Sequence, residues 1–200
     1  MRSSIKYLLV NELHDILNAE KQIVKALPKV ISAAESSELK KAFSHHLKET
    51  KAQIVRLGKI FRLLNVAKQE RCCHAMKGLI EECKEVLQEF KQKSAIRDVA
   101  LIAKAQRIEH YEVCVYGTLR TLAREIEAKE VVDLLQESLN EEGSANSTLN
   151  KIAEGGLLKS GVNHQANLEG MPKLKRRAAK KVKKAIKKRA SPVKKARRKK

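Results

Sequence analysis

The sequence predicts an all-α protein, an antiparallel four-helix bundle with a short extra helix in one crossover, followed by a disordered basic tail. The composition is dominated by Ala, Leu, Lys and Glu, which favour helix, while Pro occurs only three times. Apolar residues recur at steps of three and four along four long stretches, which is the spacing of one helix face. With 42% hydrophobic residues, the chain can fill a core.

The apolar stripes place the four long helices at about residues 4–26, 38–64, 95–126 and 129–153. A kinked continuation of the first helix to residue 34 is the alternative, because Pro28 lacks the amide hydrogen that an interior helix position uses. Ser36 and Ser37 are suitable N-caps for the second helix. The connection over 65–94 is long and contains a short helical pattern over 75–90. Such a connection lets the chain cross the bundle between its second and third long helices.

The remainder of the chain differs in character from the bundle, which we assign to residues 1–154. Residues 155–172 lose the periodicity and carry Gly, Asn and Pro, so we expect a flexible linker there. Residues 173–200 are a Lys/Ala/Arg tail that cannot bury a core and is expected to be disordered alone. The net charge of +20 is concentrated in the tail, because residues 171–200 hold 17 Lys and Arg and no acid.

The first residues contain no apolar run followed by a small-residue cleavage site, and no apolar run in the chain is long enough to cross a membrane. We therefore expect a cytoplasmic protein, without membrane insertion, whose four cysteines are reduced. Cys72, Cys73, His74 and Cys83 include zinc-ligand residue types, but their spacing matches no Cys-x-x-Cys pattern. We therefore do not expect a zinc site there, and we expect a packing role for Cys73.

Two carboxylates, Glu109 and Glu112, interrupt the apolar face of the third long helix. An ionised carboxylate that faces a core is costly unless it is paired or binds a metal. The other long helices carry inward polar residues as well: Glu20, His46, Glu49, Gln53, Glu142 and Asn146. The sequence therefore predicts a polar layer inside the bundle.

The helix lengths allow these residues to meet at one level. Glu20 and Glu49 lie about 15 and 14 residues from the first interhelical turn, and Glu112 and Glu142 lie about 16 and 14 residues from the last. At a rise of roughly 1.5 Å per residue, the carboxylates of each helical hairpin differ in height by about 3 Å or less. One inward carboxylate from each long helix can thus reach a common site.

Carboxylates with an occasional imidazole suit iron or manganese, and two ions can share bridging carboxylates. The chain carries Glu109-x-x-Glu112 and a reversed His46-x-x-Glu49, and the two acids of the third helix resemble the rubrerythrin arrangement. The alternative is a set of satisfied core polar residues, with protonated Glu or Glu paired with His46 and buried water. Tyr116, one turn beyond Glu112, is either a core residue or a neighbour of the site.

Residues 5–153 resemble the YciE/YciF family of ferritin-like bacterial stress proteins. Five blocks carry the resemblance in family order: LLVNELHDILNAEKQIVKALPK, HHLKETKAQIVRL, CCHAMKGLIEE, AQRIEHYEVCVYGTLR and VVDLLQESLNEE. The resemblance implies a ferritin-like bundle, a homodimer and a two-metal centre. This chain has Gln53 where relatives often have His, and Asn146 where many have Asp. These neutral ligands leave a weaker centre, a single ion or a vestigial site as alternatives.

The basic tail resembles those of linker histones and bacterial histone-like proteins. Its positive charges can neutralise phosphates and release counterions, which gives sequence-independent affinity for double-stranded DNA. It contains no aromatic residue on which bases could stack. The alternatives are that the tail keeps the protein in solution or that it is attracted to acidic membrane or ribosome surfaces. The DNA-binding residues would be Lys173, Lys175, Arg176, Arg177, Lys180, Lys181, Lys183, Lys184, Lys187, Lys188, Arg189, Lys194, Lys195, Arg197, Arg198, Lys199 and Lys200.

Three hypotheses follow. In the first, a stress protein with two iron or manganese ions per chain consumes peroxide or oxygen as an oxidoreductase, while its tail holds it on DNA in the nucleoid. In the second, a non-enzymatic dimer with a vestigial metal site bridges DNA. In the third, which has the least support, the bundle binds a partner and the tail is incidental.

Overall fold

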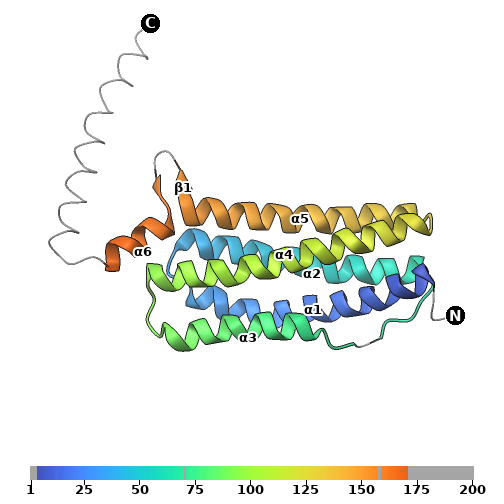
Figure 1. Cartoon of the computed structure of the whole chain (residues 1–200), viewed down its shortest axis with the longest axis horizontal. Coiled ribbons are helices and arrows are strands. Elements are labelled where there is room, and N and C mark those ends of the chain that lie inside the picture. The colour runs from blue at the N-terminus through green and yellow to red at the C-terminus, as the bar shows by residue number, and fades with distance from the viewer. Residues whose placement is uncertain (1–3, 70, 157–158, 171–200) are drawn as a thin grey trace, which may run out of the picture.

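The computed structural model describes residues 4–69, 71–156 and 159–170. The elements in chain order are α1 (Ile5–Ala33), α2 (Ser37–Leu63), α3 (His74–Glu89), α4 (Ala95–Glu125), α5 (Lys129–Glu154), β1 (Gly155–Gly156), β2 (Lys159–Ser160) and α6 (Val162–Gly170). The long helices α1, α2, α4 and α5 run lengthwise together, and α3 lies along α1 and α4 (Figure 1). The predicted all-α bundle, with a short helix in the crossover between α2 and α4, is confirmed.

Serine caps start three of the long helices. The hydroxyl oxygens of Ser4, Ser36 and Ser94 each accept a hydrogen bond from the backbone N–H three residues later. Such caps satisfy one of the amide groups that a helix start leaves without a partner. Cys73 caps α3 in the same way through its thiol, which accepts from the N–H of Met76.

The first helix continues through Pro28 to Ala33, as in the second of the two expectations for it. Pro28 is exposed, so the helical hydrogen bond that it cannot donate is lost on the solvent side. The turn that follows is fixed by Asp98 at the start of α4. Its carboxylate accepts hydrogen bonds from the backbone N–H groups of Glu35 (2.8 Å) and Ser36 (2.7 Å).

Residues 155–156 and 159–170 contain secondary structure where a flexible linker was expected. β1 and β2 form a two-stranded antiparallel hairpin, and α6 packs against α4 and α5 with Val162 and Ala166 buried. The carboxylate of Glu169 accepts a hydrogen bond from the N–H of Ala95 (3.1 Å). With only two buried positions, α6 has no periodic pattern that the sequence could reveal. The tail predicted over 173–200 lies outside the described residues.

The core has apolar ends and a polar middle. Leu9, Leu13, Phe61 and Leu135 are fully or nearly fully buried toward the α4–α5 turn, and Leu39 is buried toward the other end. Burial of each large apolar side chain contributes about 1.5–3 kcal/mol. Between these apolar parts lies a layer of buried polar side chains: Glu20, His46, Gln53, Glu109, Glu112 and Glu142.

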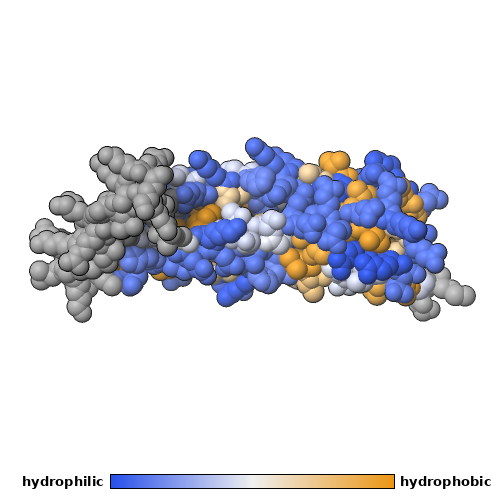
Figure 2. Space-filling model, turned by 90° about the horizontal axis from the view of Figure 1, so that it is seen from above, coloured by the Kyte–Doolittle hydropathy of each residue, from blue (hydrophilic) through white to orange (hydrophobic). Residues whose placement is uncertain are grey.

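The face seen in Figure 2 is mostly hydrophilic, and apolar side chains show on it toward the end where α4 turns into α5. In the part of the chain that the structure describes, no helix combines the length and apolar character that a membrane crossing requires.

Candidate metal centre

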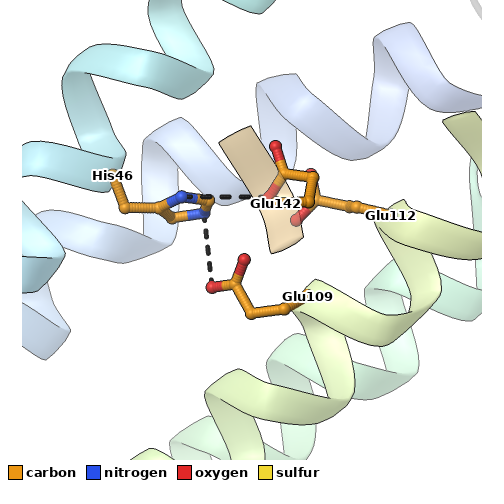
Figure 3. Close-up of side chains that lie close together, drawn as sticks. All are labelled: His46, Glu109, Glu112 and Glu142. Atoms are coloured by element: carbon orange, nitrogen blue, oxygen red, sulfur yellow. Dashed lines mark ion pairs between the residues drawn. The ribbon is translucent and has the colours of Figure 1, made fainter. Parts of the chain in front are cut away.

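Four buried side chains converge in the middle of the bundle. His46 comes from α2, Glu109 and Glu112 from α4, and Glu142 from α5, and they point toward one another (Figure 3). One ligand atom from each lies within 4.8 Å of the others. The two acids of α4 share a face because they are three residues apart, and the antiparallel packing of α4 and α5 brings Glu142 to the same height.

The distances inside this cluster suit a cation better than direct hydrogen bonds. His46 Nε2 lies 3.7 Å from Glu109 Oε1, and His46 Nδ1 lies 4.0 Å from Glu142 Oε2. Both separations exceed the length of a hydrogen bond. Two ligand atoms on opposite sides of a first-row divalent metal, each about 2.1 Å from it, are about 4 Å apart. The cluster can therefore hold an ion with little rearrangement.

Buried polar atoms without a partner gather here. Both ring nitrogens of His46 and both carboxylate oxygens of Glu112 are buried without a hydrogen bond, as is one oxygen each of Glu20, Glu109, Glu142 and Gln53. A buried polar group left without a partner costs about 1–3 kcal/mol. The oxygens, and one of the His46 nitrogens, can offer a lone pair to a cation. Because they lie in one layer, one cation would satisfy several of them together. This donor set fits iron or manganese.

Burial and mutual repulsion control the charge of the cluster. Burial, and then the neighbouring Glu142, raise the pKa values of Glu20, Glu109 and Glu112 well above the usual range. The pKa of Glu142 is raised to about 7, mainly by burial. Without a cation the layer therefore retains protons, which a bound metal would displace.

His46 is suited to bind a metal at neutral pH. Burial, with a smaller effect from the charge of His45, lowers the pKa of His46 to about 4. The imidazole is therefore neutral near pH 7, and its contacts with Glu109 and Glu142 are not ion pairs under those conditions. A neutral imidazole keeps one ring nitrogen lone pair for a metal.

Glu20, on α1, joins the layer through Tyr116. The Tyr116 hydroxyl donates a hydrogen bond to Glu20 Oε1, and both side chains are fully buried. Glu20 Oε2 has no partner. Tyr116 is thus a core residue and a neighbour of the site at once, so the two expectations for it are compatible.

Gln53 belongs to the layer with a fixed orientation. Its amide Nε2 donates to Glu141 Oε2 (2.9 Å) and to Glu142 Oε1. The carboxylate oxygens of Glu141 accept hydrogen bonds from the buried Arg56 through two contacts of 2.9 and 3.0 Å, so Glu141 acts here as an acceptor. The amide nitrogen of Gln53 must therefore face Glu141, which leaves Gln53 Oε1 free to bind a cation.

The sequence did not reveal this support from Arg56. Its guanidinium also donates to Ser138 Oγ (2.8 Å) and to Glu137, so it joins α2 to α5 beside the cluster. Such outer partners orient metal ligands and tune their basicity. The one signal available in the sequence was the spacing of Arg56, which follows Gln53 by three residues and therefore shares its helix face.

Two expected ligands lie at or beyond the edge of the cluster. The side chain of Glu49 is 19% exposed, with Oε1 3.2 Å from His45 Nε2 and Oε2 4.0 Å from His46 Nδ1. Asn146 is half-buried, and its amide oxygen accepts a hydrogen bond from Gln106 Nε2 (3.2 Å).

The four cysteines are free thiols. Cys72 and Cys114 are exposed, whereas Cys73 and Cys83 are buried. Cys73 caps α3 and its sulfur lies 3.0 Å from the Tyr111 hydroxyl. The burial and contacts of Cys73 agree with the packing role expected for it.

Comparison with known proteins places the chain among bacterial relatives that share its fold and that it covers over most of their length. It is 40% identical over 161 residues to protein YciF of Escherichia coli (strain K12), covering 80% of this chain and 96% of that protein. The crystal structure of the E. coli stress protein YciF superposes with a TM-score of 0.72, covering 74% of this chain and 94% of that one. The structure of YcfI from Rhodopseudomonas palustris matches with a TM-score of 0.72 and 41% identity over 76% of this chain and 96% of that one.

A family model described as a domain of unknown function, DUF892, matches residues 4–167, which include the whole bundle and most of α6. The expected resemblance to YciF is thereby confirmed for the bundle. The chain belongs to the DUF892 family and is a homologue of YciF with a buried His/Glu cluster that could hold a metal ion.

Proposed function

We propose that this protein is a metal-dependent stress protein whose bundle binds iron or manganese and whose tail holds it on DNA. The observation that carries the proposal is the set of buried, unpartnered oxygens and nitrogens that face one another between the four long helices. The ligands would be His46, Glu109, Glu112 and Glu142, with Glu20 and Gln53 completing a centre for two ions per chain. Glu49 and Asn146 would contribute at its edge.

Bound iron or manganese would supply one-electron chemistry toward peroxide or oxygen. The protein's own residues would hold and orient the ions, exclude water and manage protons. Tyr116 would keep Glu20 in place through its hydrogen bond, and Arg56 would keep Gln53 in place through Glu141. The carboxyls that retain protons in the metal-free state would release them when ions bind. The bundle would thus act as an oxidoreductase that limits oxidative damage.

The tail would supply the second half of this function. The 17 Lys and Arg of residues 171–200, without an acid among them, favour binding to double-stranded DNA through its phosphates. A homodimer would carry two such tails and place the metal centres in the bacterial nucleoid. Iron bound there would be kept from generating radicals beside DNA.

The direct test loads the full-length protein with Fe(II) under anaerobic conditions, removes unbound metal and measures iron per chain. We expect about two irons per chain, because ferritin-like centres of this donor type hold two ions. Glu112→Ala should lose most of them, and Glu130→Gln, an exposed change on α5, should lose none. A wild-type protein that retains no iron and no manganese would refute the metal centre.

A structural role is the second candidate, favoured by the neutral amide of Gln53 in the ligand layer. In this case a dimer would bridge DNA through its tails, and the cluster would be a protonated hydrogen-bond network. Duplex bridging that is the same in the wild type and in Glu112→Ala, with no metal on either protein, would favour it.

A further inference from the structure

An opening with both polar and apolar walls leads from the surface to the buried cluster. It lies between α2 and α5, has a volume of about 90 Å³, and reaches His46 and Glu109. Its walls are formed by Ala42, Phe43, His45 and Glu49 on α2 and by Ser144, Ala145, Thr148 and Leu149 on α5. The small side chains of α5 leave this gap, because larger ones would fill the space between the two helices. A surface groove of about 680 Å³ shares Ala42, His45 and Thr148 with it.

A chain of lone-pair donors runs through this opening. His45 is exposed and lies 3.2 Å from Glu49 Oε1, while the other oxygen of Glu49 lies 4.0 Å from His46 Nδ1. His46 is 5% exposed and its ring nitrogens have no hydrogen-bond partner. The same Nδ1 lies 4.0 Å from Glu142 Oε2. Each step is a distance that one cation can bridge.

The side of the cluster that faces α1 and α3 is apolar. A cavity of about 40 Å³ also reaches His46 and Glu109, but its other walls include Ile23, Leu27 and Leu101. Moving a divalent cation through such a wall would remove its hydration without replacement, which costs several kcal/mol or more per charge. A cation would therefore approach from the Glu49 side.

We propose that the opening between α2 and α5 is the inlet through which a divalent metal cation reaches the centre, with Glu49 as the residue that receives it and transfers it to His46. This inlet rests on the proposed metal centre. It adds the route by which a cation reaches that centre and the role of Glu49 in receiving it. It also accounts for the position of Glu49, whose carboxylate is partly exposed while the other acids of the layer are buried.

The test compares two variants of the full-length protein, each with one alanine replaced by leucine. Both alanines, Ala145 and Ala105, lie half-buried on a helix. Ala145→Leu adds an isopropyl group to the inlet, and Ala105→Leu adds the same group to the apolar cavity. Leu is a good helix former, so neither change weakens its helix through propensity. The probe is Co(II), whose binding under anaerobic conditions is followed by stopped-flow absorption, and the readouts are the uptake rate and the final cobalt content.

We expect Ala145→Leu to slow uptake at least about tenfold, equivalent to about 1.4 kcal/mol in the barrier, with wild-type cobalt content at the end. Ala105→Leu should load at the wild-type rate. Glu49→Gln should also slow uptake, because an amide attracts a cation less than a carboxylate does.

Three outcomes would overturn the inlet. Wild-type uptake rates in both Ala145→Leu and Glu49→Gln would show that cations do not pass this way. Slow uptake in Ala105→Leu alone would place the route on the apolar side. A wild-type protein that binds no cobalt would remove the metal centre itself, and the inlet with it.

Discussion

Replacing Glu142 by Gln should stabilise the metal-free protein while it weakens metal binding. Glu142 is fully buried, and its pKa is raised to about 7 by burial and by its neighbours. Gln keeps the shape and an oxygen that can accept from Gln53, but it has no proton to lose. The substitution therefore removes a charge that the folded protein holds unfavourably.

The magnitude of this stabilisation follows from the pKa of Glu142 in the folded state. With a usual value of 4.5 and a folded value of about 7, the folded protein holds a proton that the unfolded chain has already lost. Stability is therefore highest below pH 4.5 and falls as the pH rises to about 7. At 1.36 kcal/mol per pH unit, about 3 kcal/mol is lost above pH 7.

The assay is urea unfolding of EDTA-treated protein at pH 4.5 and pH 8. Glu142→Gln should be more stable than the wild type by up to about 3 kcal/mol at pH 8 and nearly equal to it at pH 4.5. Glu130→Gln removes the same charge from the exposed side of α5, where Glu130 pairs with Lys59, and should change stability by less than about 1 kcal/mol.

Bound metal should make the wild type more stable than Glu142→Gln, which reverses the order of stability of the two metal-free proteins. At 1,000 times the dissociation constant, a ligand that binds only the folded state adds about 4.1 kcal/mol, which exceeds the advantage of about 3 kcal/mol of Glu142→Gln, and the wild type should gain this with Mn(II) while Glu142→Gln gains little. A metal-free Glu142→Gln protein that is less stable than the wild type at pH 8 would refute the claim that the charge of Glu142 destabilises the metal-free fold.

Three further predictions concern the surroundings of the cluster and the tail. Tyr116→Phe should destabilise the metal-free protein by about 1–2 kcal/mol in urea unfolding, because Glu20 Oε1 loses its donor, and an unchanged stability would contradict that role. Arg56→Leu should cost about 2 kcal/mol and lower Mn(II) affinity in titration calorimetry, because Glu141 and then Gln53 lose their anchor; unchanged Mn(II) affinity would show that Arg56 is structural only. Deleting residues 171–200 should abolish duplex DNA binding in gel-shift assays, and with about 8 phosphate contacts the intact protein should show a log–log salt slope near −7. Equal affinity of the truncated protein would place the DNA contact elsewhere.

The sequence predicted the level of the cluster because the position of an inward residue along a helix is set by its distance from a turn. Glu112 and Glu142 meet for this reason, and the apolar stripes around them predicted which face is inward. Glu49 shows the limit of that reasoning. Helical spacing places it one turn from Gln53, but the small side chains of the facing part of α5 leave it partly exposed.

The supporting contacts depended on packing that no periodic pattern records. Arg56 reaches Glu141 because α2 and α5 lie at a particular rotation and separation, and these are fixed by the whole core. Asn146 turns toward Gln106 for the same reason. α6 has too few buried residues to form a stripe, and its position depends on contacts with α4 and α5 that are remote in sequence.

The most direct test of the metal centre is a crystal structure of the metal-loaded protein with anomalous diffraction measured at the iron or manganese edge. We predict anomalous peaks inside the bundle, each about 2.0–2.3 Å from side-chain atoms of His46, Glu109, Glu112 or Glu142. A map with no peak at this layer, in which the four side chains contact one another or water instead, would contradict the metal centre and leave a protonated network in the core.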